Sequence, residues 1–417
     1  MEHSIIQLDK QEDNLSGLIE NYFRQLFDDR NVSEENKQAL WEYYNNNLSK
    51  AFDLGYNSES EYYDEDLAFN LKNSIAEFSA FKETSFRSQL EAALIEDGKV
   101  VSWSEFKKKA AELNVEYNQR WLKTEYHHTV ATANSVEKWK SFEADADLYP
   151  NLKYNAVNDN RTREKHRALD GLILPINHPF WKSHNVPLDW GCRCGLEQTD
   201  EEPSSVIPSL EIKGAFQNNA ALSGKLFGEV PYEKGMNVTQ VLESKKNAKK
   251  FTANKVLQLD RNEQFKTVFK SKTGLVREHL LITKGDDYKD ILAVAKEYAK
   301  KGKTAEILPE ISEIDKTIRN LVFPNLQSKK ANPDLKVGND YFDIKRPSAF
   351  KNILGNANKA SKQGAIAVIS DSRLEKPLTD AIMNERAKDI FKNKNYNYDS
   401  VVFYREGKLI VINRTGV

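Results

Sequence analysis

The carboxylates and the amine best placed to do chemistry lie close together in the last third of the sequence. Asp334 follows Pro333, and Asp343 and Lys345 complete the pattern P-D-x8-D-x-K. On a strand Asp343 and Lys345 share a face, and a turn at Gly338 can bring Asp334 back beside them. Carboxylates in this arrangement hold Mg²⁺ or another divalent cation against a phosphodiester, while a lysine orients or deprotonates water. The pattern predicts a metal-dependent hydrolytic site; the alternative is the polar face of an exposed hairpin.

A second group of potential ligands lies between His166 and Cys194. Its members are imidazole, carboxylate and thiol side chains: His166, Asp170, His178, His184, Cys192 and Cys194. Zn²⁺ binds thiolate and imidazole tetrahedrally, and such a site adds folding energy. The Cys-x-Cys spacing differs from the Cys-x2-Cys of common zinc fingers. One interpretation is a structural Zn²⁺ on His166, Cys192 and Cys194, and the other is a polar loop packed on Trp181 and Trp190.

The elements that must position these residues divide a chain of 417 residues into two or three domains. Residues 1–146 carry apolar side chains at three- and four-residue steps, which predicts helices. From Tyr149 to Cys194, frequent Pro, Gly and Asn residues predict an irregular loop region. We therefore expect an α-rich domain over residues 1–199, a linker over 200–270 and an α/β domain over 271–417.

In the last domain, the sequence alternates between helix and strand patterns. The expected elements are a helix capped by Asp286 and ending at Lys300, strands at 334–337 and 341–345, a helix through Phe350 to Ala360, a strand at 365–370 and a hairpin of 401–404 with 408–413. This order predicts a mixed sheet flanked by helices. The expected fold class of the whole chain is multidomain α+β.

Charge and composition exclude several classes of protein. The net charge is −1, but residues 272–417 hold 27 Lys and Arg against 19 Asp and Glu, a net +8 that would attract a polyanion. No apolar stretch is long enough for a membrane span, no secretory leader is evident and no nucleotide-binding glycine loop is present. We expect a cytoplasmic protein that makes no membrane contact.

The loop region resembles a known family. Arg161-x4-His166-x3-Asp170-Gly171, followed by Trp181 and then Pro-x4-Cys-Arg-Cys ending at Cys194, is similar to the phage Mu F-like head morphogenesis family of minor head proteins. The resemblance covers about residues 50–197, with the signature at 154–195. It implies a prophage-encoded component of the assembled phage head, with portal and capsid proteins as partners.

The C-terminal pattern resembles the PD-(D/E)XK nuclease superfamily, whose core is a mixed sheet with a helix on each side. More specifically, it looks like the C-terminal tRNA-nuclease toxins of contact-dependent inhibition (CdiA) proteins; the matching positions are Glu306, Asp334, Asp343, Lys345 and Gln363. The resemblance implies cleavage of tRNA or other nucleic acid, a divalent cation on Asp334 and Asp343, and an immunity protein as a partner. An additional metal ligand is expected in the stretch bounded by Glu306 and Glu310.

Two alternatives remain at this point. Mu F-like heads are also fused to nucleases of the barnase–EndoU–RelE group, which use no metal. The acid–base groups here would be His279, or Lys345 with Arg346, and the partner positions would be Ser348, Arg405 and Thr415. The other alternative is a purely structural virion protein whose C-terminal domain only binds nucleic acid.

Overall fold

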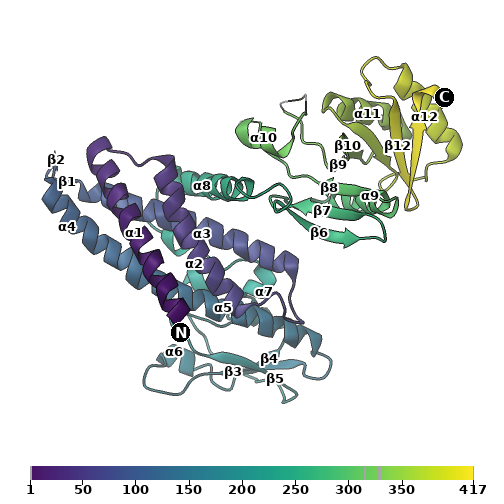
Figure 1. The fold of residues 1–417 in the computed structure, drawn as a ribbon. Helices are drawn as coiled ribbons and strands as arrows, with labels where there is room; N and C mark the ends of the chain where they lie inside the picture. The colour runs from purple at the N-terminus through teal and green to yellow at the C-terminus, as the bar shows by residue number, and fades with distance from the viewer. Residues whose placement is uncertain (1, 314–315, 327, 329, 417) are drawn as a thin grey trace. The chain divides into compact units, whose positions relative to one another are not determined.

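The computed structural model describes residues 2–313, 316–326, 328 and 330–416, and the side chains of these except residues 2–14, 317 and 416. The chain forms two compact units, Met1–Thr252 and Ala253–Val417 (Figure 1). The first is rich in helices and the second contains a mixed sheet with helices, which confirms the predicted α+β class. No helix among the described residues is both long and apolar enough to cross a bilayer.

Long helices build the first unit. They are α1 (Glu2–Asp29), α2 (Glu34–Gly55), α3 (Glu65–Ala93), α4 (Trp103–Asn114), the π-helix η1 (Val115–Trp121), α5 (Leu122–Ala144) and α8 (Val238–Leu257), which runs on into the second unit. Polar caps set where three of them begin: Ser33 caps α2, Asp64 caps α3, and Ser102 forms a capping box with Glu105 at α4. These caps satisfy backbone N–H groups that have no partner within the helix.

The predicted loop region contains a small sheet. Strands β3 (Asn151–Asn155), β4 (Ile173–Pro175) and β5 (Gly195–Thr199) pair antiparallel in the order β4-β3-β5. The one-turn helix α6 (Glu164–Arg167) lies in the connection between β3 and β4, beside the sheet (Figure 1). The sequence missed these strands because each is short and the connections between them are rich in turn residues.

The remaining short elements of the first unit are β1 (Ile95–Glu96), β2 (Lys99–Val100), η2 (Pro179–Lys182), η3 (Gly214–Phe216), α7 (Ala220–Ser223) and η4 (Pro231–Glu233). Apolar residues of 212–227 belong to the core of this unit, as Ile212, Phe216 and Phe227 show. The structure therefore differs from the linker predicted over residues 200–270. The rest of that segment includes the helix α8 and the strand β6, so it contains regular elements as well as core residues.

Charged side chains are buried between the helices of the first unit. The Lys82 ammonium on α3 lies 3.0 Å from the Glu125 carboxylate on α5, and both side chains are almost fully buried. Lys82 also donates a hydrogen bond to the Tyr232 hydroxyl, which in turn donates to Glu125. Because buried charges are stable only when paired, this network fixes how α3, α5 and η4 pack.

The second unit is built on an eight-stranded sheet. Its strands are β6 (Phe265–Lys270), β7 (Leu275–His279), β8 (Thr304–Ile307), β9 (Leu335–Val337), β10 (Asp340–Lys345), β11 (Ile366–Ser370), β12 (Ser400–Arg405) and β13 (Lys408–Asn413). They follow one another across the sheet in chain order. The pairs β7–β8, β10–β11 and β11–β12 are parallel and the others antiparallel, so the predicted mixed sheet is confirmed.

Helices cover both faces of this sheet. They are α9 (Tyr288–Lys300), α10 (Lys316–Val322), η5 (Phe350–Asn352), α11 (Ile353–Lys362), α12 (Asp380–Lys392) and η6 (Arg414–Gly416). Val368 on β11 packs in the cluster that includes α9, whereas its neighbours Ala367 and Ile369 pack in the cluster that includes α11 and α12. This alternation buries β11 on both faces, as expected for a central parallel strand.

Several predicted boundaries in this unit hold and others do not. The strands β9 to β13 lie within one or two residues of the prediction, whereas α11 begins at Ile353, three residues after the predicted start at Phe350, which lies in η5. The helix α9 begins at Tyr288 after Asp287 rather than directly after Asp286. The sheet also includes β6 at Phe265–Lys270, ahead of the predicted domain start at 271, because β6 pairs with β7 as a hairpin.

The buried pair of Lys82 and Glu125 gives a test of the first unit. Lys82→Ala leaves the Glu125 carboxylate buried without its cation, so we expect the free energy of unfolding to fall by about 3–5 kcal/mol. Lys72→Ala is the matched control, because Lys72 pairs with Asp53 at 2.6 Å on the surface, where such pairs contribute about 0–1 kcal/mol. Denaturant titration of the full chain measures both; equal losses would contradict the role of the buried pair.

Candidate functional site

The hairpin of β9 and β10 brings the predicted acidic residues together. Gly338 adopts a positive φ of 63° in the turn, a conformation that glycine adopts without strain. Register pairs Phe342 with Leu335, which places Asp334 at the start of β9 beside the end of β10. One Asp334 carboxylate oxygen accepts the Ile344 backbone N–H at 2.6 Å. The turn predicted at Gly338 therefore does return Asp334 to the strand that carries Asp343 and Lys345.

Two carboxylates and one amine form the centre of this site. The Lys345 ammonium lies 2.7 Å from the Asp343 carboxylate, which is almost completely buried. Burial raises the pKa of Asp334 well above its usual value, and the nearby Asp343 charge raises it further. Burial also raises the pKa of Asp343, against the opposing effect of Lys345. A site in which the buried Asp343 and the half-buried Asp334 lie beside one cation favours binding of a further positive charge, and carboxylate oxygens are ligands that Mg²⁺ prefers.

A buried arginine supports the segment that leads to Asp334. Arg319 on α10 donates hydrogen bonds to the Ile311 and Ala331 carbonyls and, at 2.8 Å, to the Asn332 side chain. Asn332 also accepts the Ile311 N–H at 3.1 Å. These bonds fix the backbone two residues before Asp334.

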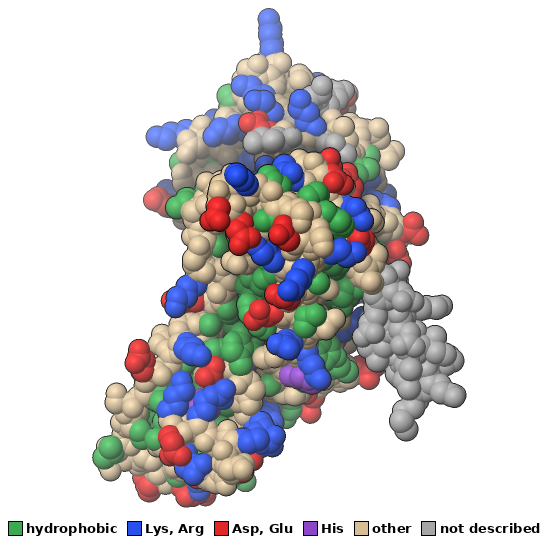
Figure 2. Space-filling view, turned by 90° about the vertical axis from the view of Figure 1, so that its left-hand side faces the viewer, with side chains coloured by type: hydrophobic (Ala, Val, Ile, Leu, Met, Phe, Trp, Pro, Cys, Tyr) green, Lys and Arg blue, Asp and Glu red, His purple; other side chains and the backbone are tan. Residues whose placement is uncertain are grey.

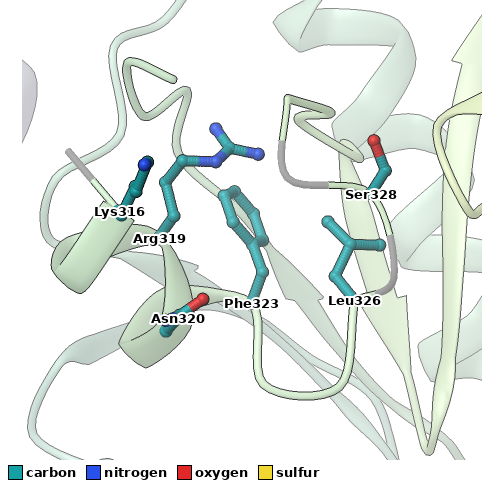
Figure 3. A pocket seen from close by; sticks show the side chains of 6 residues that line it. All are labelled: Lys316, Arg319, Asn320, Phe323, Leu326 and Ser328. Carbon is teal, nitrogen blue, oxygen red and sulfur yellow. The ribbon is translucent and has the colours of Figure 1, made fainter. Parts of the chain in front are cut away.

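The same arginine lines a pocket of about 110 Å³ on the second unit. Figure 3 shows Lys316, Arg319 and Asn320 on α10, with Phe323, Leu326 and Ser328 from the segment that follows. The Arg319 guanidinium lies 5.2 Å from the Phe323 ring centroid. Since the Arg319 hydrogen bonds already go to the chain, we assign this arginine to positioning rather than to ligand binding.

No hydrogen bond among the described residues joins the two remaining predicted residues, Glu306 and Gln363, to these acids. Glu306 on β8 pairs with Arg261 at 3.4 Å and also with Arg277. Two arginines thus neutralise its carboxylate, two strands away from Asp343 in the sheet. Gln363 ends α11, and no hydrogen bond among the described residues joins it to the acids. The structure therefore brings Asp334, Asp343 and Lys345 together and does not add Glu306 or Gln363.

Acidic residues at the start of α9 were missed as members of the site. The negative charge of Asp287 contributes to the raised pKa of Asp343. Asp290 lies 3.5 Å from the Arg346 guanidinium and 3.4 Å from the Ser370 hydroxyl. The run Asp286-Asp287 was visible as a helix start, but its closeness to Asp343 depends on how α9 packs on the sheet.

The residues required by a metal-free nuclease are poorly placed for acid–base chemistry. His279 is completely buried, burial lowers its pKa to about 4, and its Nδ1 accepts the Leu281 N–H at 3.1 Å. Arg346 pairs with Asp286 and Asp290, and Arg405 pairs with Asp380. The sequence alone could not reveal that His279 is enclosed.

Charged side chains of both signs are interspersed on the face of the molecule in Figure 2. That face shows no uniform basic area that would attract a polyanion through charge alone.

The second predicted group also converges in part. His166 on α6 is buried, and its Nδ1 lies 3.6 Å from the Cys192 sulfur and 3.9 Å from the Cys194 sulfur. The three potential ligand atoms lie within 4.8 Å of one another, and both cysteines are free. Hydrogen bonds from Cys192, His166 and Tyr154 lower the pKa of Cys194 to about 4, although burial opposes the shift.

The other members of this group have separate roles. The Asp170 carboxylate accepts the Ala156 N–H and the Asn158 amide at 2.8 and 2.6 Å. His178 accepts the Phe180 N–H at 3.2 Å, and His184 stacks on the Phe180 ring at 4.1 Å. The six potential ligands of the sequence therefore reduce to three.

Comparison with known proteins concerns the first unit. Residues 86–197 match the family described as Phage Mu protein F like protein. The matched segment contains His166, Cys192 and Cys194, and it lies within the resemblance predicted over residues 50–197. The match supports the Mu F-like character of this part of the chain; the nuclease resemblance of the second unit stays a prediction.

Two curated relatives agree with this family. One is the "Mu-like prophage FluMu F protein" of Haemophilus influenzae, 38% identical over 82 residues, which are 20% of this chain and 20% of the relative. The other is the "Putative capsid assembly protein F" of Escherichia phage Mu, 37% identical over 75 residues, 18% of this chain and 17% of the relative. The aligned region thus spans about one fifth of the length of each relative. No solved structure matches the chain.

The raised pKa values of the two acids predict a stability effect. An acid whose pKa is higher in the folded state costs that state free energy once the pH exceeds the ordinary pKa. We therefore expect Asp343→Asn to raise the melting temperature of the metal-free protein at neutral pH by roughly 2–4 °C, as about 1 kcal/mol does in a unit of this size. The gain should vanish at a pH below the ordinary pKa of aspartate.

Asp340→Asn in the same hairpin is the control, because Asp340 is exposed. Thermal unfolding of the full chain in a chelator, at neutral and acid pH, makes the comparison. A loss of stability in Asp343→Asn at neutral pH would show that the acids are fully compensated by Lys345.

Proposed function

We propose that this chain is a prophage-encoded minor head protein whose C-terminal unit hydrolyses phosphodiester bonds with the help of a divalent cation. The Mu F-like match over residues 86–197 supports the first part. The observation that carries the second part is the meeting of Asp334, Asp343 and Lys345 at one hairpin. Around it, α9 covers one face of a mixed sheet and α11 the other, as the nuclease resemblance implies.

In this mechanism, Asp334 and Asp343 would hold the cation. When bound, a divalent cation supplies positive charge to the scissile phosphate and lowers the pKa of its water. Asp334 is kept in position by the Ile344 N–H, and Asp343 is oriented by Lys345. The Lys345 side chain is the more exposed of this pair, so its ammonium is the group that meets the phosphate and orients the attacking water.

The substrate we propose is tRNA, on the resemblance to the contact-dependent inhibition toxins. An immunity protein that neutralises the nuclease and portal or capsid proteins that hold the chain in the head would be its partners. The metal-free RNase is the less favoured function, because His279 is enclosed. A structural protein that only binds nucleic acid is the competing function of another class, and turnover distinguishes the two.

Cleavage assays with the full chain test the nuclease. Total tRNA, total RNA and plasmid DNA are incubated with Mg²⁺ or with EDTA. We expect cleavage of tRNA with Mg²⁺ and none with EDTA, and a loss of rate of ~10²-fold or more in Asp343→Ala and Lys345→Ala, because each removes charge stabilisation at the reacting phosphate. Lys351→Ala, which removes an exposed lysine of η5, should leave the rate unchanged.

Binding of the same nucleic acids by Lys345→Ala separates the functions. A nuclease loses turnover in this variant and keeps most of its affinity, whereas a binding protein has no turnover to lose. Cleavage that resists EDTA would favour the metal-free RNase, and no cleavage of any substrate would leave the structural role.

Head assembly is tested in particles from a host that carries the prophage. We expect mass spectrometry of purified heads to find the full chain, and to find it equally with Asp343→Ala, because that change lies outside the Mu F-like segment. If purified heads, whether empty or filled, contain no detectable amount of this chain, the protein is not a component of the virion. Failure of only the Asp343→Ala variant to enter heads would link the two units functionally.

A further inference from the structure

We propose that His166, Cys192 and Cys194 bind one Zn²⁺ ion, which clips together two irregular connections of the first unit. This site is independent of the nuclease centre, since it lies in the other unit and uses different ligand chemistry. Its consequence is structural: the metal stabilises the segment that carries the Mu F-like signature.

The distances between the ligand atoms fit a tetrahedral zinc site. With Zn–N and Zn–S bonds of about 2.05 and 2.3 Å, the tetrahedral angle separates nitrogen from sulfur by about 3.6 Å. The His166 Nδ1 lies 3.6 and 3.9 Å from the two sulfurs. All three atoms lie within 4.8 Å of one another, where zinc would place two sulfurs about 3.8 Å apart. A movement of at most about 1 Å between the two sulfurs brings all three atoms into coordination range.

The types of ligand select the metal. Two thiolates and one imidazole form a soft donor set, which favours zinc over the hard cations Mg²⁺ and Ca²⁺. The cysteines are not joined to each other, and only Arg193 separates them in the sequence. Both sulfurs are therefore available to one ion.

The chain around the ligands is held in place by its own contacts. Gly191 has a φ of 67°, and this turn precedes Cys192, whose N–H donates to the Asp189 carbonyl at 3.1 Å. The buried Asp189 carboxylate pairs with Arg163 at 3.4 Å, just before α6. Arg193, between the two cysteines, binds Asp159 through two hydrogen bonds of 2.9 and 2.6 Å. The two connections are thus already tied together on both sides of the ligand atoms.

The ligands lie in the irregular connections between the strands of the small sheet. His166 belongs to the connection between β3 and β4, and the cysteines end the connection between β4 and β5, directly before Gly195 pairs with Asn155. Long irregular segments cost conformational entropy to order. An ion that joins them adds its binding free energy to folding.

One coordination position remains for a small ligand. Among the described residues, three side chains offer donor atoms, and a small pocket beside them is lined by Val157, Arg161 and Thr162 as well as by the ligands. Water from this pocket completes the tetrahedron in our proposal, as in other zinc sites with three protein ligands.

Metal analysis of the full chain tests the site. Protein purified under reducing conditions should contain one zinc per chain, and Cys192→Ser, Cys194→Ser and His166→Ala should each lose it. His184→Ala is the matched control, since His184 lies in the same region but stacks on Phe180. Asp343→Ala should also keep its zinc, which separates this site from the nuclease centre.

A second measurement guards against variants that fail to fold. The reduced wild-type chain, stripped of metal and titrated with Co²⁺, should develop a thiolate-to-cobalt charge-transfer band and the intense visible absorption of a tetrahedral ion, both saturating at one equivalent. Removing the metal should lower the melting temperature. Protein without zinc that also shows no such cobalt spectrum would overturn the proposal, as would a band that persists in the Cys192→Ser and Cys194→Ser double variant.

Discussion

Compensation of buried charge is the constraint that organises both units of this protein. In the first unit, Lys82 and Glu125 balance each other, and Tyr232 forms a hydrogen bond with each of them. In the second, Asp334 and Asp343 share one partner, Lys345. The Lys82–Glu125 pair has no net charge and holds the helices in place. The group of Asp334, Asp343 and Lys345 has two acids and one cation, so it lacks one positive charge. Identical physics thus gives a structural element in one unit and a candidate active site in the other.

In the sheet of the second unit, some acidic residues belong to the candidate site and others only stabilise the fold. The strand β10 pairs with β9 on one side and β11 on the other, in the middle of the sheet, and the Asp343 side chain that it carries is almost completely buried. Outside the sheet, the hydrogen bond from Arg319 to the Asn332 side chain fixes the backbone segment that precedes Asp334. Glu306 shows the opposite outcome: on β8 two arginines occupy its carboxylate, and an acid of suitable type becomes part of the framework.

Sequence reasoning succeeded where the determining contacts are local. The spacing of Asp334, Asp343 and Lys345 around Gly338 was enough to predict that these side chains meet. A tight hairpin and the two-residue repeat of a strand decide which side chains come together. It failed where partners are distant. Nothing near Glu306 shows that Arg261 and Arg277 will bind it, and nothing near His279 shows that it will be enclosed. The linker predicted over residues 200–270 failed for the same reason in its first part, since the apolar residues of 212–227 lie in short elements yet belong to the core of the first unit.

The order of the strands also bears on how the second unit folds. The β9–β10 hairpin closes through a turn at Gly338, whereas the parallel pairs β10–β11 and β11–β12 require crossings through α11 and α12. Short loops close faster than long ones, so we expect the hairpin to form before the parallel pairs. In that order, Asp334 and Asp343 would meet while water still surrounds them, and they would lose this water only when β11 and α11 dock. The free-energy cost of desolvating the two carboxylates would therefore arise late in folding, in the same steps in which burial of hydrophobic side chains stabilises the protein.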